Sequence, residues 1–143
     1  MPILQKILKH SDYGLSLFSD SEIKRLEEKI ITKENDGQIK YYVNCIVRDK
    51  EILLKPEEIV RQLYASRLIA SYDYPRERIK FEHAVHFGRE VKSADIVVFD
   101  KDYPTVEYII VELKKPKLLD GKKQLYSYCN ATGAPIGIWC NGD

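Results

Sequence analysis

The sequence predicts an α/β fold in which a central mixed sheet is flanked by helices. Residues 93–100 and 106–114 are apolar at successive positions, so both faces of each expected strand carry Ile, Val or Phe. A sheet that is apolar on both faces has to be covered on both sides. Segments with helical spacing of apolar residues stand before and after these two strands. The helices are therefore expected to supply the cover.

Residues 1–54 are expected to form a small N-terminal extension that packs on the core. Ser19 and Glu22 match a capping box, in which each residue bonds the backbone of the other at the start of a helix. Alternating apolar residues further on indicate a hairpin. The elements expected here are a helix over 19–31, a break at 33–37 and a hairpin over 39–54 that turns at 48–51.

Residues 55–143 are expected to form the core. Pro56 stands at a favoured first helical position, and Asp120 can cap a second helix. Pro116 should close the second central strand because it has no N–H for a ladder bond. The elements expected in this part are a helix from 56 to about 71, strands over 78–87, 93–100 and 106–114, a helix over 120–130 and a strand over 136–140.

Composition restricts the class of protein. The 143 residues, 44% hydrophobic and 31% charged, suit one globular domain, and a net charge of +1 gives no general attraction for nucleic acid. Three cysteines without a CxxC spacing argue against a zinc site and indicate reduced thiols in a cytoplasmic protein. No segment is apolar and long enough for a membrane span. The end of the chain, three residues after an apolar strand, suggests a fragment of a longer protein.

Asp95 and Glu112 interrupt the two apolar strands, and a buried charge costs several kcal/mol unless it is paired or functional. In an antiparallel hairpin, pairing Asp95 with Glu112 centres the turn between Tyr103 and Pro104. That segment also has the composition of a turn. Directly opposed residues have Cβ atoms about 5 Å apart, so both carboxylates could hold one divalent cation. Lys114 must share a face with Glu112 because side chains alternate along a strand.

Hard oxygen ligands suit Mg²⁺ or Mn²⁺ better than zinc. The carbonyl oxygen of Leu113 could add a third ligand to Asp95 and Glu112. Such a cation would activate a water and neutralise charge on a phosphate, and Lys114 would lie beside that phosphate. An ordinary solvated network of salt bridges would use the same residue types, and Glu-x-Lys alone carries little information.

Further candidates surround this set. Gln124 and Tyr128, four residues apart, share a helix face and could contact DNA or orient the lysine, although a half-buried amphipathic helix has the same spacing. Glu82 could join the metal site, and Glu57 or Glu58 stays open as well. A local basic patch that could bind phosphates comprises Lys114, Lys115, Lys117, Lys122 and Lys123.

The combined pattern resembles the PD-(D/E)xK nuclease superfamily. It consists of Asp95, a sixteen-residue gap, Glu112-Leu113-Lys114 and then Gln124-x-x-x-Tyr128. More narrowly, the amino-acid sequence of these segments is similar to that of the N-terminal endonuclease domain of type I restriction enzyme R (HsdR) subunits. The resemblance covers roughly residues 55–142. One departure is Ala94, which stands where the motif's name has proline.

This resemblance implies a restriction-endonuclease-like three-layer core and a Mg²⁺-dependent cut of double-stranded DNA. Asp95 and Glu112 would bind the metal, Lys114 would complete the catalytic triad, and Gln124 and Tyr128 would be accessory. It also implies a longer R subunit whose translocase domain uses ATP, with modification and specificity subunits as partners. The alternatives are a nuclease of the same fold in recombination or repair, and a catalytically inactive DNA-binding module.

Overall fold

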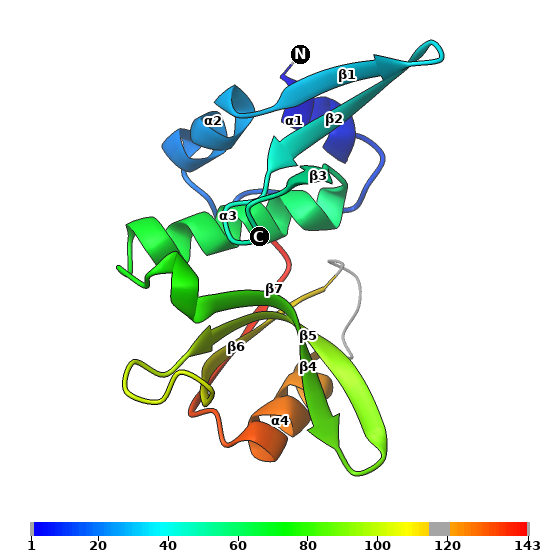
Figure 1. Ribbon diagram of the computed structural model, residues 1–143. Coiled ribbons are helices and arrows are strands. Elements are labelled where there is room, and N and C mark those ends of the chain that lie inside the picture. Colours follow the sequence, from blue (N-terminus) through cyan, green and yellow to red (C-terminus); the bar gives the residue numbers. More distant parts are fainter. Residues whose placement is uncertain (1, 115–120, 143) are drawn as a thin grey trace.

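The computed structural model describes residues 2–114 and 121–142, and Figure 1 shows how their helices and strands are arranged. Strands form two separate sheets, one in each half of the chain. The elements are α1 (Ile3–Leu8), α2 (Asp20–Glu28), β1 (Ile31–Asn35), β2 (Gln38–Asn44), β3 (Glu51–Leu53), α3 (Pro56–Ala70), η1 (Arg76–Arg78), β4 (Ile79–Phe87), β5 (Glu90–Phe99), β6 (Glu107–Leu113), α4 (Gly121–Thr132) and β7 (Ile136–Cys140).

The second sheet has the strand order β4-β5-β6-β7 and is mixed. Neighbours from β4 to β6 are antiparallel, whereas β6 and β7 run parallel. A parallel pair needs a crossover connection, and the chain between β6 and β7 contains α4. The predicted mixed α/β fold is therefore confirmed.

The register between β5 and β6 is the predicted one. Val97 pairs with Ile110, and Ile96 pairs with Val111, so each pair of numbers has the sum that the proposed Asp95–Glu112 pair requires. An irregularity between Val98 and Phe99 shifts the register only beyond this point, toward the connecting loop. The positions of the two carboxyls are thus set by three successive apolar pairs, 96–98 with 109–111.

The two faces of this sheet are buried against different helices. Ile96 and Val111 belong to a core cluster that includes residues of α3, and Val97 and Ile110 belong to a second cluster that includes residues of α4. Figure 1 shows α3 above the sheet and α4 below it. The apolar run of each strand is explained because successive side chains enter opposite clusters.

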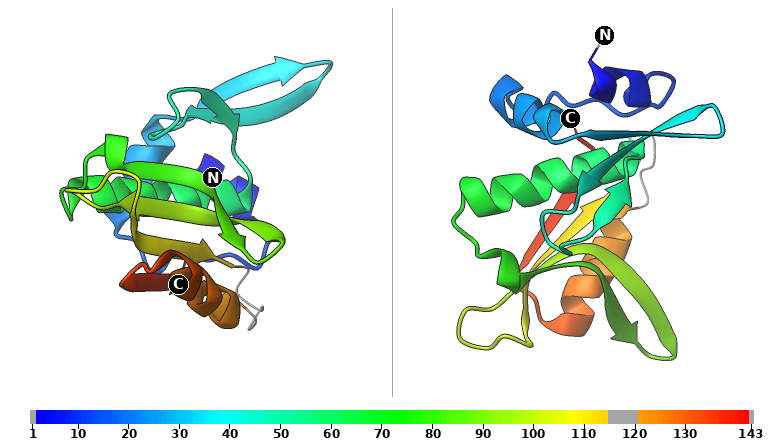
Figure 2. Two further views of the ribbon diagram at one scale, coloured as in Figure 1. Left: turned by 60° about the horizontal axis from the view of Figure 1, so that its bottom comes forward. Right: turned by 45° about the horizontal axis from the view of Figure 1, so that its top comes forward.

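The N-terminal half lies on the far side of α3 from the mixed sheet (Figure 1). It contains the antiparallel sheet β1-β2-β3, whose β1–β2 hairpin extends away from the rest of the molecule in Figure 2. Leu4, Leu26 and Val43 join the same core cluster as α3. Consequently α3 is packed from two sides, and even its Arg61 and Gln62 are buried.

The sequence predictions for this half are partly confirmed. Ser19 and Glu22 do form the capping box at the start of α2. The predicted break at 33–37 is wrong, because β1 pairs with β2 through this segment. Asp36 and Gly37 have φ of 51° and 76°, which is the geometry of a tight two-residue hairpin turn and suits an Asp-Gly pair. Helix α1 was not predicted.

The contact between α4 and β7 predicts the effect of a substitution at Gly137. A Cβ atom there would lie 2.9 Å from Cys129 Sγ and 3.2 Å from Leu125 Cγ. Gly137→Ala should therefore lower the free energy of unfolding by about 1–3 kcal/mol, as overpacking does. Urea denaturation measures this. Ser127→Ala, on the exposed side of α4, is the control, and equal stability of both variants would contradict this packing.

Candidate active site

The carboxylates of Asp95 and Glu112 lie where β5 and β6 stop pairing. The last regular pair before them is Ile96 with Val111. At the next position the backbone N–H of Asp95 donates to Glu112 Oε1 at 3.4 Å, and the N–H of Leu113 donates to Asp95 Oδ2 at 2.7 Å. Each carboxylate thus accepts an N–H bond from the opposite strand. Both side chains are thereby held over the same gap between the strands, as the predicted register requires.

Burial makes this pair electrostatically unfavourable. Glu112 is 1% exposed, and the loss of water, followed by the neighbouring charge of Asp95, raises its pKa to about 7. Burial also raises the pKa of Asp95, against the opposing effects of the Leu113 N–H and Arg61. A carboxyl whose proton affinity is raised by burial and by a second carboxylate favours any cation that can lie between the two.

Lys114 lies beside Glu112 at the end of β6. Its Nζ is 3.4 Å from Glu112 Oε2, and its side chain is a quarter exposed. The backbone N–H of Lys114 donates to the carbonyl of Cys140 at 2.9 Å, which ties this position to β7. The lysine therefore has a fixed backbone and a side chain that reaches both Glu112 and solvent.

Arg61 of α3 is a site residue that the sequence prediction missed. It is 5% exposed and contacts carboxylates from three elements. The sequence does contain a signal for ion pairs at Arg61, because Glu57 and Glu58 precede it by four and three residues in the same helix. Its guanidinium lies 2.9 Å from Glu58, 3.3 Å from Glu82, 3.4 Å from Asp95 and 3.6 Å from Glu57.

The three open candidates, Glu57, Glu58 and Glu82, all contact this arginine. Glu82 has a φ of 52° inside β4, a rare conformation for a residue with a side chain, and Arg48 also binds it at 2.9 Å. Partial burial alone would raise the pKa of Glu82, but its bonds with Arg48 and Arg61 lower it. Among the described residues no three His, Cys, Asp or Glu side chains are arranged to hold a metal. Glu57, Glu58 and Glu82 thus contact Arg61, and the metal site predicted from the sequence stays a prediction for Asp95 and Glu112.

Gln124 and Tyr128 approach the site from α4. The Gln124 amide donates to the Tyr128 hydroxyl oxygen, so the predicted pair does share a helix face. Tyr128 is fully buried, and burial, followed by the charge of Glu112, raises its pKa to about 12. Its phenol therefore remains protonated at neutral pH.

A hollow of about 400 Å³ is bordered by His10, Tyr13, Lys55 and Glu57, and Glu57 is one of the acids that contact Arg61. Burial, then the charges of Glu57 and Asp95, raises the pKa of Tyr13 to about 12. The N-terminal segment therefore lies close enough for the charges of Glu57 and Asp95 to affect Tyr13, which no sequence motif indicated. Of the predicted basic patch, Lys115 and Lys117 lie outside the described residues, as does the predicted cap Asp120.

The raised pKa of Glu112 predicts how stability changes with pH in EDTA. The folded state binds this proton more tightly than the unfolded chain, whose carboxyl has a pKa near 4.5. Stability should therefore fall as the pH rises from 4.5 to 7 and level off above 7. Glu112→Gln should flatten this slope and stabilise the protein at pH 8 by up to about 3 kcal/mol. Denaturation with urea at several pH values measures it.

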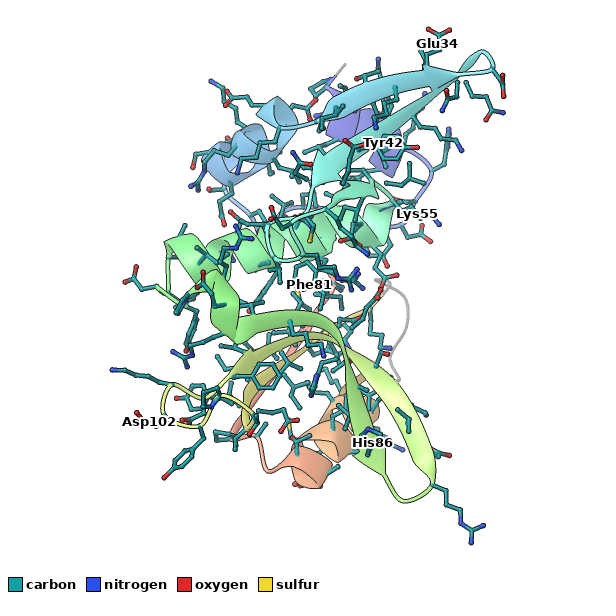
Figure 3. The ribbon with its side chains drawn as sticks, in the orientation of Figure 1. Glu34, Tyr42, Lys55, Phe81, His86 and Asp102 are labelled. Atoms are coloured by element: carbon teal, nitrogen blue, oxygen red, sulfur yellow. The ribbon has the colours of Figure 1, made fainter. Side chains whose placement is uncertain are left out.

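Glu34→Gln serves as the control for that titration, because Glu34 is exposed on the β1–β2 hairpin, far from the mixed sheet (Figure 3). It should keep the wild-type slope. A Glu112→Gln variant with the wild-type slope would contradict the buried, charged pair.

The sequence that carries this site matches a known protein family. No curated protein matches the chain. No helix among the described residues is long and apolar enough to cross a membrane. The family described as Type I restriction enzyme R protein N terminus (HSDR_N) matches residues 56–143, which run from α3 to β7 and contain Asp95, Glu112, Lys114 and the α4 pair. The chain therefore belongs to the family of type I restriction enzyme R protein N-terminal regions.

Proposed function

We propose that this chain is the Mg²⁺-dependent endonuclease module of a type I restriction enzyme R subunit and hydrolyses phosphodiester bonds of double-stranded DNA. The observation that carries the proposal is the buried Asp95–Glu112 pair with Lys114 beside it, in a family whose enzymes restrict DNA. The site brings five carboxylates together with three bases: the acids are Glu57, Glu58, Glu82, Asp95 and Glu112, and the bases are Arg48, Arg61 and Lys114. The resulting excess of negative charge is useful for binding a cation.

Asp95, Glu112 and the Leu113 carbonyl would hold Mg²⁺ or Mn²⁺. The residues fit such an ion, because the donors are hard oxygens and because burial, which raises the pKa of both carboxyls, favours a cation that would neutralise them. When bound, the cation supplies a more acidic water and neutralises charge on the phosphate. The repulsion between the two acids would then be relieved in the loaded state.

The other side chains act on the phosphate and on the attacking water. Lys114 would donate from its ammonium group to a phosphate oxygen and stabilise the charge that develops there. Tyr128, held protonated and bonded by Gln124, would donate a hydrogen bond that orients the water or a phosphate oxygen. The hollow beside Tyr13 and Lys55 gives the DNA backbone a place to approach.

The proposal includes a larger assembly. With a net charge of only +1, the chain has little general attraction for DNA, so we propose that a translocase domain of the full-length R subunit brings DNA to the site. ATP would act only through that motor, and modification and specificity subunits would choose the DNA sequence. We place this assembly in the cytoplasm.

Two other functions compete with this one. A nuclease of the same restriction-endonuclease-like fold in recombination or repair would use the same site, but the family match favours restriction. An inactive DNA-binding module is disfavoured because the three residues with the expected chemistry lie together. Inactivity of the wild type in every assay below would support that last alternative.

Cleavage of circular duplex DNA with Mg²⁺ by the complete complex tests the proposal. Asp95→Asn should remove metal binding, and Lys114→Ala should remove the phosphate contact, so each should slow cutting by at least about 100-fold. ATP hydrolysis by the motor should persist in both variants, which shows that the complex is assembled.

Matched controls replace the same residue types away from the site. Asp102 lies in the loop between β5 and β6, at the edge of the molecule in Figure 3, and Lys80 is exposed on β4. Asp102→Asn and Lys80→Ala should cut like the wild type. Wild-type cutting by both Asp95→Asn and Lys114→Ala would refute the assignment.

A further inference from the structure

Arg61 joins the acidic site to the rest of the molecule. It lies on α3 and reaches Asp95 on β5 and Glu82 on β4, in addition to the acids of its own helix. Its guanidinium also lies 5.6 Å from the ring centre of Phe81, which Figure 3 shows between α3 and the sheet. A buried arginine with several carboxylates around it is a fixed positive charge next to the site.

The contacts of Arg61 differ in strength. Arg61 Nη1 donates a short hydrogen bond to Glu58 Oε2 at 2.9 Å, whereas the bond from Nη2 to Asp95 Oδ1 is longer, at 3.4 Å. Its buried Nε has no hydrogen-bond partner among the described residues. The shortest bond of the guanidinium is thus the one to Glu58 in its own helix, and Glu82 on β4 binds it as well, at 3.3 Å. The guanidinium can keep its position while the Asp95 carboxylate turns toward another cation.

A second arginine of α3 provides a comparison. Arg67 binds Glu22 at 2.7 Å and the Leu17 carbonyl at 2.7 Å, and it joins α3 to the start of α2. This is an ordinary structural ion pair between one base and one acid. Arg61, in contrast, faces four carboxylates, one of which belongs to the candidate metal site.

We propose that Arg61 is the internal counter-ion of the acidic site: it holds Asp95 in place when no metal is bound and competes with the metal for that carboxylate. The proposal rests on the proposed function, because the metal is the one assigned to Asp95 and Glu112. Arg61 is a positioning residue, since it acts through Asp95 and contacts no reacting group.

The first half of the proposal can be tested without metal. In EDTA, the melting temperatures of Arg61→Gln, Asp95→Asn and the double variant form a mutant cycle. The double variant should lose at least about 3 °C less than the sum of the single losses, because each single change removes one partner of the same interaction. Additive losses would refute the contact as a stabilising one.

The second half is tested by titrating Mn²⁺ into the chain by calorimetry. A positive charge about 6 Å from a divalent ion weakens its binding by about tenfold even in a dielectric like that of water. Arg61→Gln should therefore bind Mn²⁺ about tenfold more tightly than wild type. Arg61→Lys keeps the charge, so its Mn²⁺ affinity should stay within about twofold of wild type.

Arg67→Gln is the matched control, because it removes a partly buried arginine ion pair from the same helix at a distance from the acids. It should lower the melting temperature and leave Mn²⁺ affinity unchanged. Equal or weaker Mn²⁺ binding by Arg61→Gln would overturn the competition. If neither wild type nor Asp95→Asn binds Mn²⁺, the proposed metal site fails instead, and the role of Arg61 in holding Asp95 is decided by the EDTA cycle alone.

Discussion

The repulsion between two carboxylates buried on neighbouring strands is the constraint on which the rest of the site depends. Asp95 and Glu112 are placed together by an apolar register that neither residue can change. Four polar groups around them lower the cost of that arrangement: the N–H groups of Asp95 and Leu113, the ammonium of Lys114 and the guanidinium of Arg61. These contacts do not fully offset the cost of burying the two carboxylates, since both carboxyls still have a raised pKa. A site with such uncompensated negative charge is suited to bind a cation.

Helix α3 connects this site to the N-terminal half. One side of it packs on the mixed sheet and supplies Arg61, and the other side packs against residues of the N-terminal half, including α2 through Arg67 and Glu22. The family match begins at residue 56, the first residue of α3. The segment before it nevertheless brings Tyr13 close enough for Asp95 to affect its pKa. The N-terminal half therefore belongs to the environment of the site, whatever further role it has.

Local rules were sufficient for much of the fold and for the central pair. Capping chemistry located α2, alternation and turn composition set the register of β5 and β6, and these placed Asp95 opposite Glu112. The same rules could not locate Arg61 at the site, because its importance comes from β4 and β5, which are more than twenty residues away. Tyr13 was missed for the same reason. Strand β1 was missed for a different reason. Its Asp36-Gly37 turn is a local signal, but the sequence prediction took the segment 33–37 as a break after the helix and not as part of a hairpin.

The central claim is that Asp95 and Glu112 hold one divalent cation, and the most direct measurement is anomalous diffraction from a crystal of the chain soaked in Mn²⁺. The account predicts a single strong peak between the two carboxylates, with oxygen atoms of both about 2–2.5 Å from the ion. It also predicts that Asp95 has moved away from Arg61. A peak elsewhere, or a site that stays without Mn²⁺ while Asp95 keeps its contact with Arg61, would contradict the account.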